Sequence, residues 1–93
     1  MNTNVVTYPD TQDVFAAIEA AKPKGYEVTF EYPGYTSIRN EEVWGEDYEI
    51  AVGDADDCFG WSDTDDQGGL FFAITEPKEI AQRVWDIVKE MEQ

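Results

Sequence analysis

The chain has 93 residues and a formal net charge of −15, set by 21 acidic residues against 6 basic ones. Nucleic acid and anionic membrane surfaces repel such a chain, so we expect it to bind neither directly. It has no His, and Cys58 is its one cysteine, which excludes an internal disulfide, His-based catalysis and His/Cys zinc sites. Because 42% of the residues are hydrophobic, we expect a folded chain forming one domain over residues 1–93.

The start of the chain predicts a helix followed by a strand. Pro9 and Asp10 precede apolar residues at helical spacing, and Pro23 to Gly25 ends that pattern, so we expect a helix over residues 10–22. The following residues alternate between apolar and polar, which predicts a strand with one buried face. The residues of that face are Tyr26, Val28, Phe30 and Tyr32.

Turn residues and further alternation predict the rest of a sheet. Pro33 and Gly34 are typical of a turn, and the residues after them can pair back on the first strand. We expect the sheet to be antiparallel. Its further strands are predicted at residues 35–40, 48–52, 58–61 and 70–75, the last two joined by the turn-rich segment 62–69.

The end of the chain predicts a second helix. Thr75 or Glu76 is a suitable cap, and Pro77 suits the first turn. An apolar stripe follows and should lie on the sheet; it consists of Ile80, Val84, Ile87, Val88 and Met91. The sequence therefore predicts an α+β fold with an N-terminal helix, an antiparallel sheet of four to five strands and a C-terminal helix packed on the sheet.

The negative charge is concentrated in the middle of the chain. Residues 1–40 and 67–93 each hold 5 acidic and 3 basic residues, whereas residues 41–66 hold 11 acidic residues and no basic one. A merely solvated surface, or a salt-adapted composition, would spread acid over all exposed faces, so the segregation favours a partner-binding surface. The candidate partner-binding residues are Glu41, Glu42, Trp44, Glu46, Asp47, Glu49, Asp54, Asp56, Asp57, Asp63, Asp65 and Asp66.

Aromatic residues occur within and near this acidic segment. Exposed tryptophans can anchor an interface or stack on a partner's Arg, whereas buried ones pack a core. The two interpretations weigh equally for Trp44, which lies between acidic residues and a glycine. Core packing is favoured for Trp61, inside a predicted strand, and for Trp85, on the last helix.

One Asp-rich segment begins like a calcium-binding loop. Asp63, Asp65 and Gly68 match positions 1, 3 and 6 of an EF-hand loop, but position 12 is Ile74 instead of Glu. We expect a hairpin turn there and no metal site, with weak association of divalent ions left open. Cys58 has no His to activate it and is interpreted as a packing residue. No acid stands out as catalytic, so we expect neither enzyme activity nor a cofactor.

No export or membrane signal is evident in the sequence. No apolar run approaches the roughly 18 residues of a membrane-spanning helix. Residues 1–7 lack the basic flank and the apolar stretch of a secretion signal. We therefore expect a cytoplasmic protein.

The size, the α+β layout and the acidic segment 41–66 together resemble small phage or mobile-element inhibitors that mimic nucleic acid, such as anti-CRISPR and anti-restriction proteins. DNA carries one negative charge per about 1.7 Å of duplex axis, so eleven carboxylates correspond to about 19 Å. The resemblance implies an inhibitor, monomeric or homodimeric, that binds the nucleic-acid-binding surface of a bacterial defence nuclease or CRISPR complex in the host cytoplasm. It includes no diagnostic motif, so no residue role is transferred.

An immunity protein is the alternative hypothesis. Such a protein uses the same electrostatic attraction to bind a basic nuclease toxin and block its active site. Composition alone does not separate the two hypotheses. Mimicry predicts competition with DNA and a steep loss of affinity with salt, while immunity predicts buried aromatic anchors and modest salt dependence.

Overall fold

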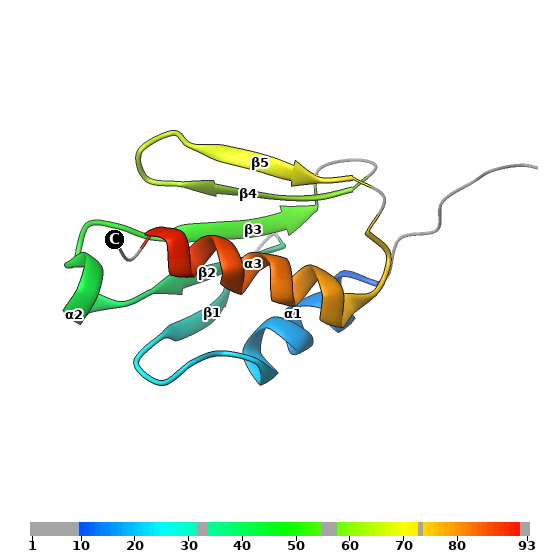
Figure 1. Cartoon of the computed structure of the whole chain (residues 1–93), viewed down its shortest axis with the longest axis horizontal. Helices are drawn as coiled ribbons and strands as arrows, with labels where there is room; N and C mark the ends of the chain where they lie inside the picture. The colour runs from blue at the N-terminus through cyan, green and yellow to red at the C-terminus, as the bar shows by residue number, and fades with distance from the viewer. Residues whose placement is uncertain (1–9, 32–33, 55–57, 73, 92–93) are drawn as a thin grey trace, which may run out of the picture.

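The computed structural model describes residues 10–31, 34–54, 58–72 and 74–91. Within these ranges the chain forms three helices and five strands (Figure 1). In chain order they are α1 (Thr11–Ala20), β1 (Glu27–Glu31), β2 (Tyr35–Arg39), α2 (Glu41–Trp44), β3 (Ile50–Asp54), β4 (Phe59–Asp63), β5 (Gly68–Phe71) and α3 (Pro77–Met91).

The five strands form one sheet in which each strand pairs antiparallel with the next. Their order in space is therefore their order in sequence, from β1 at one edge to β5 at the other. Helices α1 and α3 pack on one another and lie on the same face of the sheet (Figure 1). This arrangement confirms the predicted α+β fold, including the antiparallel sheet and the C-terminal helix packed on it.

The face of the sheet beneath the helices holds the hydrophobic core. Directly paired residues share a face, and the register pairs Ile38 with Ile50 and Val52 with Trp61. Apolar side chains of α1 and α3 close over this face, and their burial provides the main stabilising free energy. The core consists of Val14, Phe15, Ile18, Tyr26, Ile38, Ile50, Val52, Phe59, Phe71, Ile80, Ala81, Val84, Trp85 and Val88.

The opposite face, which we call the uncovered face, has no helix over it in the described residues (Figure 1). The register aligns one row of small residues across all five strands on this face. This row runs Thr29, Ser37, Ala51, Ser62 and Gly68. This row is too small to form an apolar patch, so any such patch on the uncovered face must consist of larger side chains beside the row.

Trp85 joins the two long helices, which confirms its expected packing role. Its indole Nε1 donates a hydrogen bond of 3.0 Å to the carbonyl oxygen of Ile18 on α1. Its ring meets Tyr26 edge to face, with ring centroids 5.5 Å apart. Cys58 is buried as well, as expected for a packing residue.

Some element bounds differ from the predicted ones. Helix α1 starts where the Asp10 side chain accepts a hydrogen bond from the amide of Gln12, and it ends at Ala20. Strand β5 covers residues 68–71 instead of 70–75, because Gly68 and Gly69 pair with residues of β4, which in turn extends to residue 63. The short helix α2 was not predicted, since four residues are too few to establish a helical period.

The predicted buried face of the first strand is only partly correct. Tyr26 is buried and Val28 is half-buried, but Phe30 is 52% exposed. Phe30 lies on the edge strand β1, where one side chain, Phe15 of α1, stacks on it with ring centroids 5.9 Å apart. Tyr32, the fourth residue of that face, lies outside the described residues.

No helix in the part of the chain that the structure describes is long enough and apolar enough to cross a membrane.

Candidate protein-binding interface

The connections on either side of β3 and β4 meet at one end of the sheet. The register places Ile50, the first residue of β3, opposite Asp63, the last residue of β4. Beyond this pair, the amide of Thr64 donates a hydrogen bond of 3.2 Å to the carbonyl oxygen of Glu49. Residues 41–49 and 63–67, far apart in sequence, therefore lie together, and α2 and the β4–β5 turn mark this end in Figure 1.

Most of the predicted acidic residues lie at this end, on connections more than on strands. Six of them are exposed there: Glu41, Glu42, Glu46, Asp47, Asp65 and Asp66. Asp54 is also exposed, but it is the last residue of β3 and lies at the opposite end of the strand, four residues or about 13 Å from Ile50. Asp56 and Asp57 lie outside the described residues. The fold thus separates Asp54 from the other described candidates.

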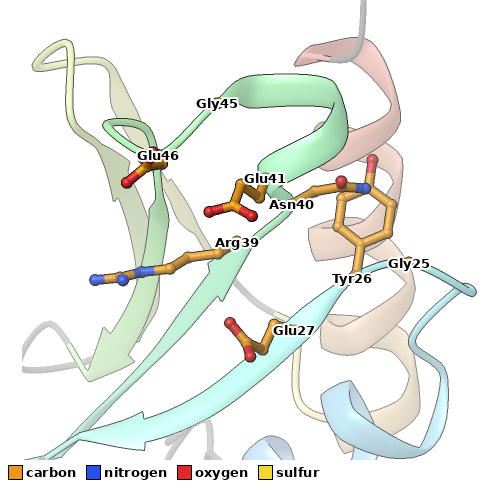
Figure 2. Close-up of a pocket in the computed structure, with 8 residues that line it drawn as sticks. All are labelled: Gly25, Tyr26, Glu27, Arg39, Asn40, Glu41, Gly45 and Glu46. Carbon is orange, nitrogen blue, oxygen red and sulfur yellow. The ribbon is translucent and has the colours of Figure 1, made fainter.

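Glu27 joins this group, although it lies outside the acidic segment 41–66 and was not among the predicted residues. It starts β1 and pairs with Arg39, the last residue of β2, so it lies at the same end as α2. It lines a hollow of about 520 Å³ together with Glu41 and Glu46 (Figure 2). The pairing of β1 with β2 could have revealed the position of Glu27. A count of charge along the sequence does not take strand pairing into account. We call the six exposed residues and Glu27 the acidic end.

The single basic residue in this hollow, Arg39, is paired internally. Its Nη2 and Nε lie 2.7 and 2.9 Å from Oε1 of Glu49, which also accepts a 2.9 Å hydrogen bond from Ser37. The hydrogen bond from Arg39 lowers the pKa of Glu49, against the opposing effect of burial. Glu49 raises the pKa of Arg39 in return. Glu49 is therefore the hydrogen-bonded partner of Arg39, which also attracts Glu27 of the acidic end through its charge.

Asp63 organises the β4–β5 turn instead of facing outward. Its carboxylate accepts hydrogen bonds from the amides of Asp65 and Gln67, at 3.0 and 2.8 Å, and from the Tyr48 hydroxyl at 2.7 Å. Desolvation works against ionisation of Asp63, but these hydrogen bonds outweigh it and lower its pKa. Burial, and then the hydrogen bond to Asp63, raises the pKa of Tyr48.

This turn confirms the hairpin predicted for the Asp-rich segment. Asp66 takes up the left-handed conformation, with φ of 66°, as Asp tolerates in turns. The Asp63 carboxylate is directed to amides of its own turn. Among the described residues, the structure brings together no group of three or more Cys, Asp or Glu residues that could hold a metal ion.

Trp44 lies between the core and the interface. Its ring meets Tyr26 and Tyr48 edge to face, with centroids 5.4 and 4.9 Å apart, and its Nε1 is buried without a hydrogen-bond partner in the described chain. It also lines a second hollow, of about 510 Å³, at the acidic end. The other residues lining this hollow are Val43, Asp47, Tyr48, Asp65, Gln67 and Met91.

The acidic end therefore offers exposed carboxylates around two hollows, one of them with aromatic walls. Glu27, Glu41 and Glu46 surround the first hollow, while Asp47 and Asp65 lie at the second. Such an arrangement suits Lys and Arg side chains, because carboxylates pair with their charged groups and aromatic rings attract cations.

No family model, curated protein sequence or solved structure matches the chain.

Proposed function

We propose that the chain is a small acidic inhibitor that binds the nucleic-acid-binding surface of a bacterial defence nuclease or CRISPR complex, as a DNA mimic. The observation that supports this proposal best is the gathering of seven exposed carboxylates at one end of the sheet, while Arg39 is paired with Glu49. At the charge density of duplex DNA, seven charges correspond to about 12 Å of helix axis. A groove that binds a phosphate backbone offers the Lys and Arg residues that these carboxylates require.

The carboxylates contribute to binding through long-range attraction and through direct pairing. Complementary charge raises the rate of encounter between the partners and fixes their relative orientation. The first hollow would take a Lys or Arg of the partner between Glu27, Glu41 and Glu46, the carboxylates that Figure 2 displays around it. Occupation of the groove by this end would then exclude DNA by simple competition.

Charge reversal at the acidic end tests the proposal. In the variant, Glu42, Asp47 and Asp65 are changed together to Lys. The original chain and the variant are each immobilised, and the proteins that each retains from a bacterial lysate are compared. If each lost ion pair contributes about 0.5 kcal/mol, affinity for the retained nucleic-acid-binding protein falls at least about tenfold. Mass spectrometry identifies the retained protein, and its nuclease or DNA-binding activity is measured with and without the chain.

The matched control reverses Glu19, Asp54 and Glu79, which are also exposed but lie outside the acidic end. Both variants have the same net charge, so a difference between them reports position instead of total charge. Equal retention by the two variants would contradict the proposed interface.

An immunity protein against a nuclease toxin is the second candidate. The observation that favours it is the aromatic wall of the second hollow, where Trp44 and Tyr48 stand beside Asp47 and Asp65. Aromatic residues in such pockets are common binding hot spots. A retained toxin that resists elution by salt, and whose release is unaffected by duplex DNA, would favour this candidate over mimicry.

A further inference from the structure

The two edges of the sheet differ in how they are protected against further strand pairing. Edge strands have unpaired backbone N–H and C=O groups, and charged residues commonly keep other strands away from them. β1 has such residues, Glu27 and Glu31. β5 and its flanks have none, because the nine residues from Gln67 to Thr75 are all uncharged. In a chain with net charge −15, this neutral edge is an exception.

The same edge exposes two large apolar side chains. Leu70 is 50% exposed and lies on the uncovered face by strand alternation, while Phe72, the residue after β5, is 69% exposed. Both residues also line the groove between this edge and α3. Phe71 between them is buried on the helix-covered face. Water therefore contacts both the open backbone edge and a small apolar patch beside it.

The sequence of this edge is complementary to itself. If two copies pair antiparallel about a two-fold axis at Leu70, then Gly68 faces Phe72, Gly69 faces Phe71 and Leu70 faces Leu70 of the other copy. Each glycine thus meets a phenylalanine, a pairing that compensates for the missing side chain of an edge glycine. The pairing uses one residue beyond the end of β5, namely Phe72.

Other registers fit less well. A shift by one residue would pair side chains of the covered face with side chains of the uncovered face. A shift by two would centre the pair on Gly69 or Phe71, which sets Phe72 opposite Asp66 in the first case and Gly68 opposite Ile74 in the second, so the pairing of Gly68 with Phe72 is lost. The register centred on Leu70 pairs all five residues and joins the exposed leucines and phenylalanines of both copies into one patch.

The acidic turns of the two copies lie apart in this arrangement, although each copy has a high net charge. Antiparallel pairing keeps the two acidic turns at opposite ends of the joined strands. Asp65 and Asp66 of each copy then lie toward the uncharged segment after Phe71 of the other copy. The groove of about 410 Å³ between that segment and α3 is lined by Arg83 together with Asp86 and Glu90, so some like-charge repulsion between the copies remains at this contact.

We propose that two copies of the chain form a homodimer by antiparallel pairing of β5 with β5 of the second copy, joining their sheets into one of ten strands. One strand pair is small against the roughly 1,200–2,000 Å² that stable interfaces bury in total, so the dimer is reversible and depends on concentration. The acidic end and the β5 edge adjoin at Asp65 and Asp66, but strand pairing through β5 does not depend on what the acidic end binds.

Disulfide trapping tests the register. Leu70→Cys places two thiols directly opposite one another at the axis. The Cα atoms of the two cysteines are then about 5.5 Å apart, within the roughly 4.4–6.8 Å that a disulfide spans. Oxidation of this variant in dilute solution should yield a covalent dimer several times faster than oxidation of Phe72→Cys. In the paired strands, the two residues at position 72 are about 13 Å apart along the strand direction.

Two controls accompany the trapping. Thr29→Cys places an exposed thiol on the opposite edge strand and should cross-link slowly, while the unsubstituted chain should not, since Cys58 is only 4% exposed. Equal rates for Leu70→Cys and Thr29→Cys would overturn the proposal. So would faster trapping at residue 72 than at residue 70.

Sedimentation of the unmodified chain provides a second readout. The dimer fraction should rise with NaCl, because salt screens the repulsion between two acidic copies. Leu70→Lys combined with Phe72→Lys should yield a monomer with unchanged circular dichroism. A dimer that persists in this double variant, or one that dissociates with salt, would contradict pairing through β5.

Discussion

Asp63 shows that acidic residues of one sequence segment serve different purposes. Its carboxylate accepts hydrogen bonds from two backbone amides of the β4–β5 turn and from the hydroxyl of Tyr48. Asp65, two residues later, is exposed and accepts none of the hydrogen bonds that hold this turn. The same residue type therefore stabilises the fold at one position and is available to a partner at the other.

Replacement of Asp63 by Ala should destabilise the protein even though it removes a negative charge from a crowded region. The amides of Asp65 and Gln67 and the Tyr48 hydroxyl all lose their acceptor, and we expect a loss of about 1–2 kcal/mol in the free energy of unfolding. Urea denaturation followed by tryptophan fluorescence measures it. The control, Asp65→Ala, should leave stability unchanged or raise it slightly, and a larger loss in the control than in Asp63→Ala would contradict this role.

The same substitution should change how stability depends on pH. The pKa of Asp63 is lower in the folded chain than its ordinary value, so its stabilising contribution is complete above that value, about 3.9. It is lost as the pH falls through the lower, folded pKa. The difference in stability between the original chain and Asp63→Ala should therefore shrink below about pH 4. Relief of repulsion among the other carboxylates affects both proteins alike and does not alter that difference.

At the scale of elements, α2 positions the acidic end. The Asn40 side chain accepts a hydrogen bond of 3.2 Å from the amide of Val43 and begins the helix, and Gly45, with φ of 81°, ends it. This short helix directs Glu41 and Glu42 into solvent while Trp44 packs on Tyr26. A loss of the cap should therefore affect the interface as well as stability.

Asn40→Ala should lower the free energy of unfolding by about 1 kcal/mol, the usual effect of removing a helix N-cap. Because α2 holds two residues of the acidic end, the variant should also bind the retained partner more weakly than the original chain at the same salt concentration. Thermal unfolding and a binding titration measure the two effects. Asn40→Asp, which keeps a capping oxygen, should retain most of both properties, and equal losses in both variants would exclude the cap as the cause.

Much of the sheet and of the long helices could be predicted because their apolar residues repeat over several turns or strand pairs. Val28 lies between polar residues, Val52 lies between the small residues Ala51 and Gly53, and the apolar residues from Ile80 to Met91 repeat at helical spacing. α2 is too short for such a period, although Asn40 before it and Gly45 after it are local signals of a start and an end. β5 was displaced in the prediction because glycines argue against a strand, whereas here Gly68 packs so closely on β4 that a Cβ atom would lie 2.6 Å from the carbonyl oxygen of Trp61.

The candidate interface was predictable in composition but not in geometry. Sequence position grouped Asp54 with its acidic neighbours, whereas the length of β3 moves it to the other end of the sheet. Glu27 was missed for the converse reason, since strand pairing brings it beside Arg39 from a segment of ordinary charge balance. The sequence also does not show that Glu49 forms an ion pair and Asp63 a hydrogen bond within the chain, whereas the exposed carboxylates are available to a partner.

At the scale of the whole molecule, the antiparallel sheet brings carboxylates together at one end, where they repel one another. Two carboxylates about 7 Å apart in water repel by about 0.6 kcal/mol, and salt reduces this. The core beneath α1 and α3 must offset that repulsion, and a basic partner would remove it on binding. The arrangement is thus compatible with a stable fold and is electrostatically improved by a complex, which is the basis of the proposed function.

The most direct test is competition between the chain and duplex DNA for the purified partner, measured as a function of NaCl concentration. If the acidic end occupies the DNA-binding groove, duplex DNA displaces the chain from the partner, and the logarithm of the affinity falls steeply with the logarithm of salt concentration. The slope becomes shallower when Glu42, Asp47 and Asp65 are reversed to Lys, and does not when Glu19, Asp54 and Glu79 are. A complex that binds DNA and the chain at the same time, with affinity insensitive to salt, would contradict the account.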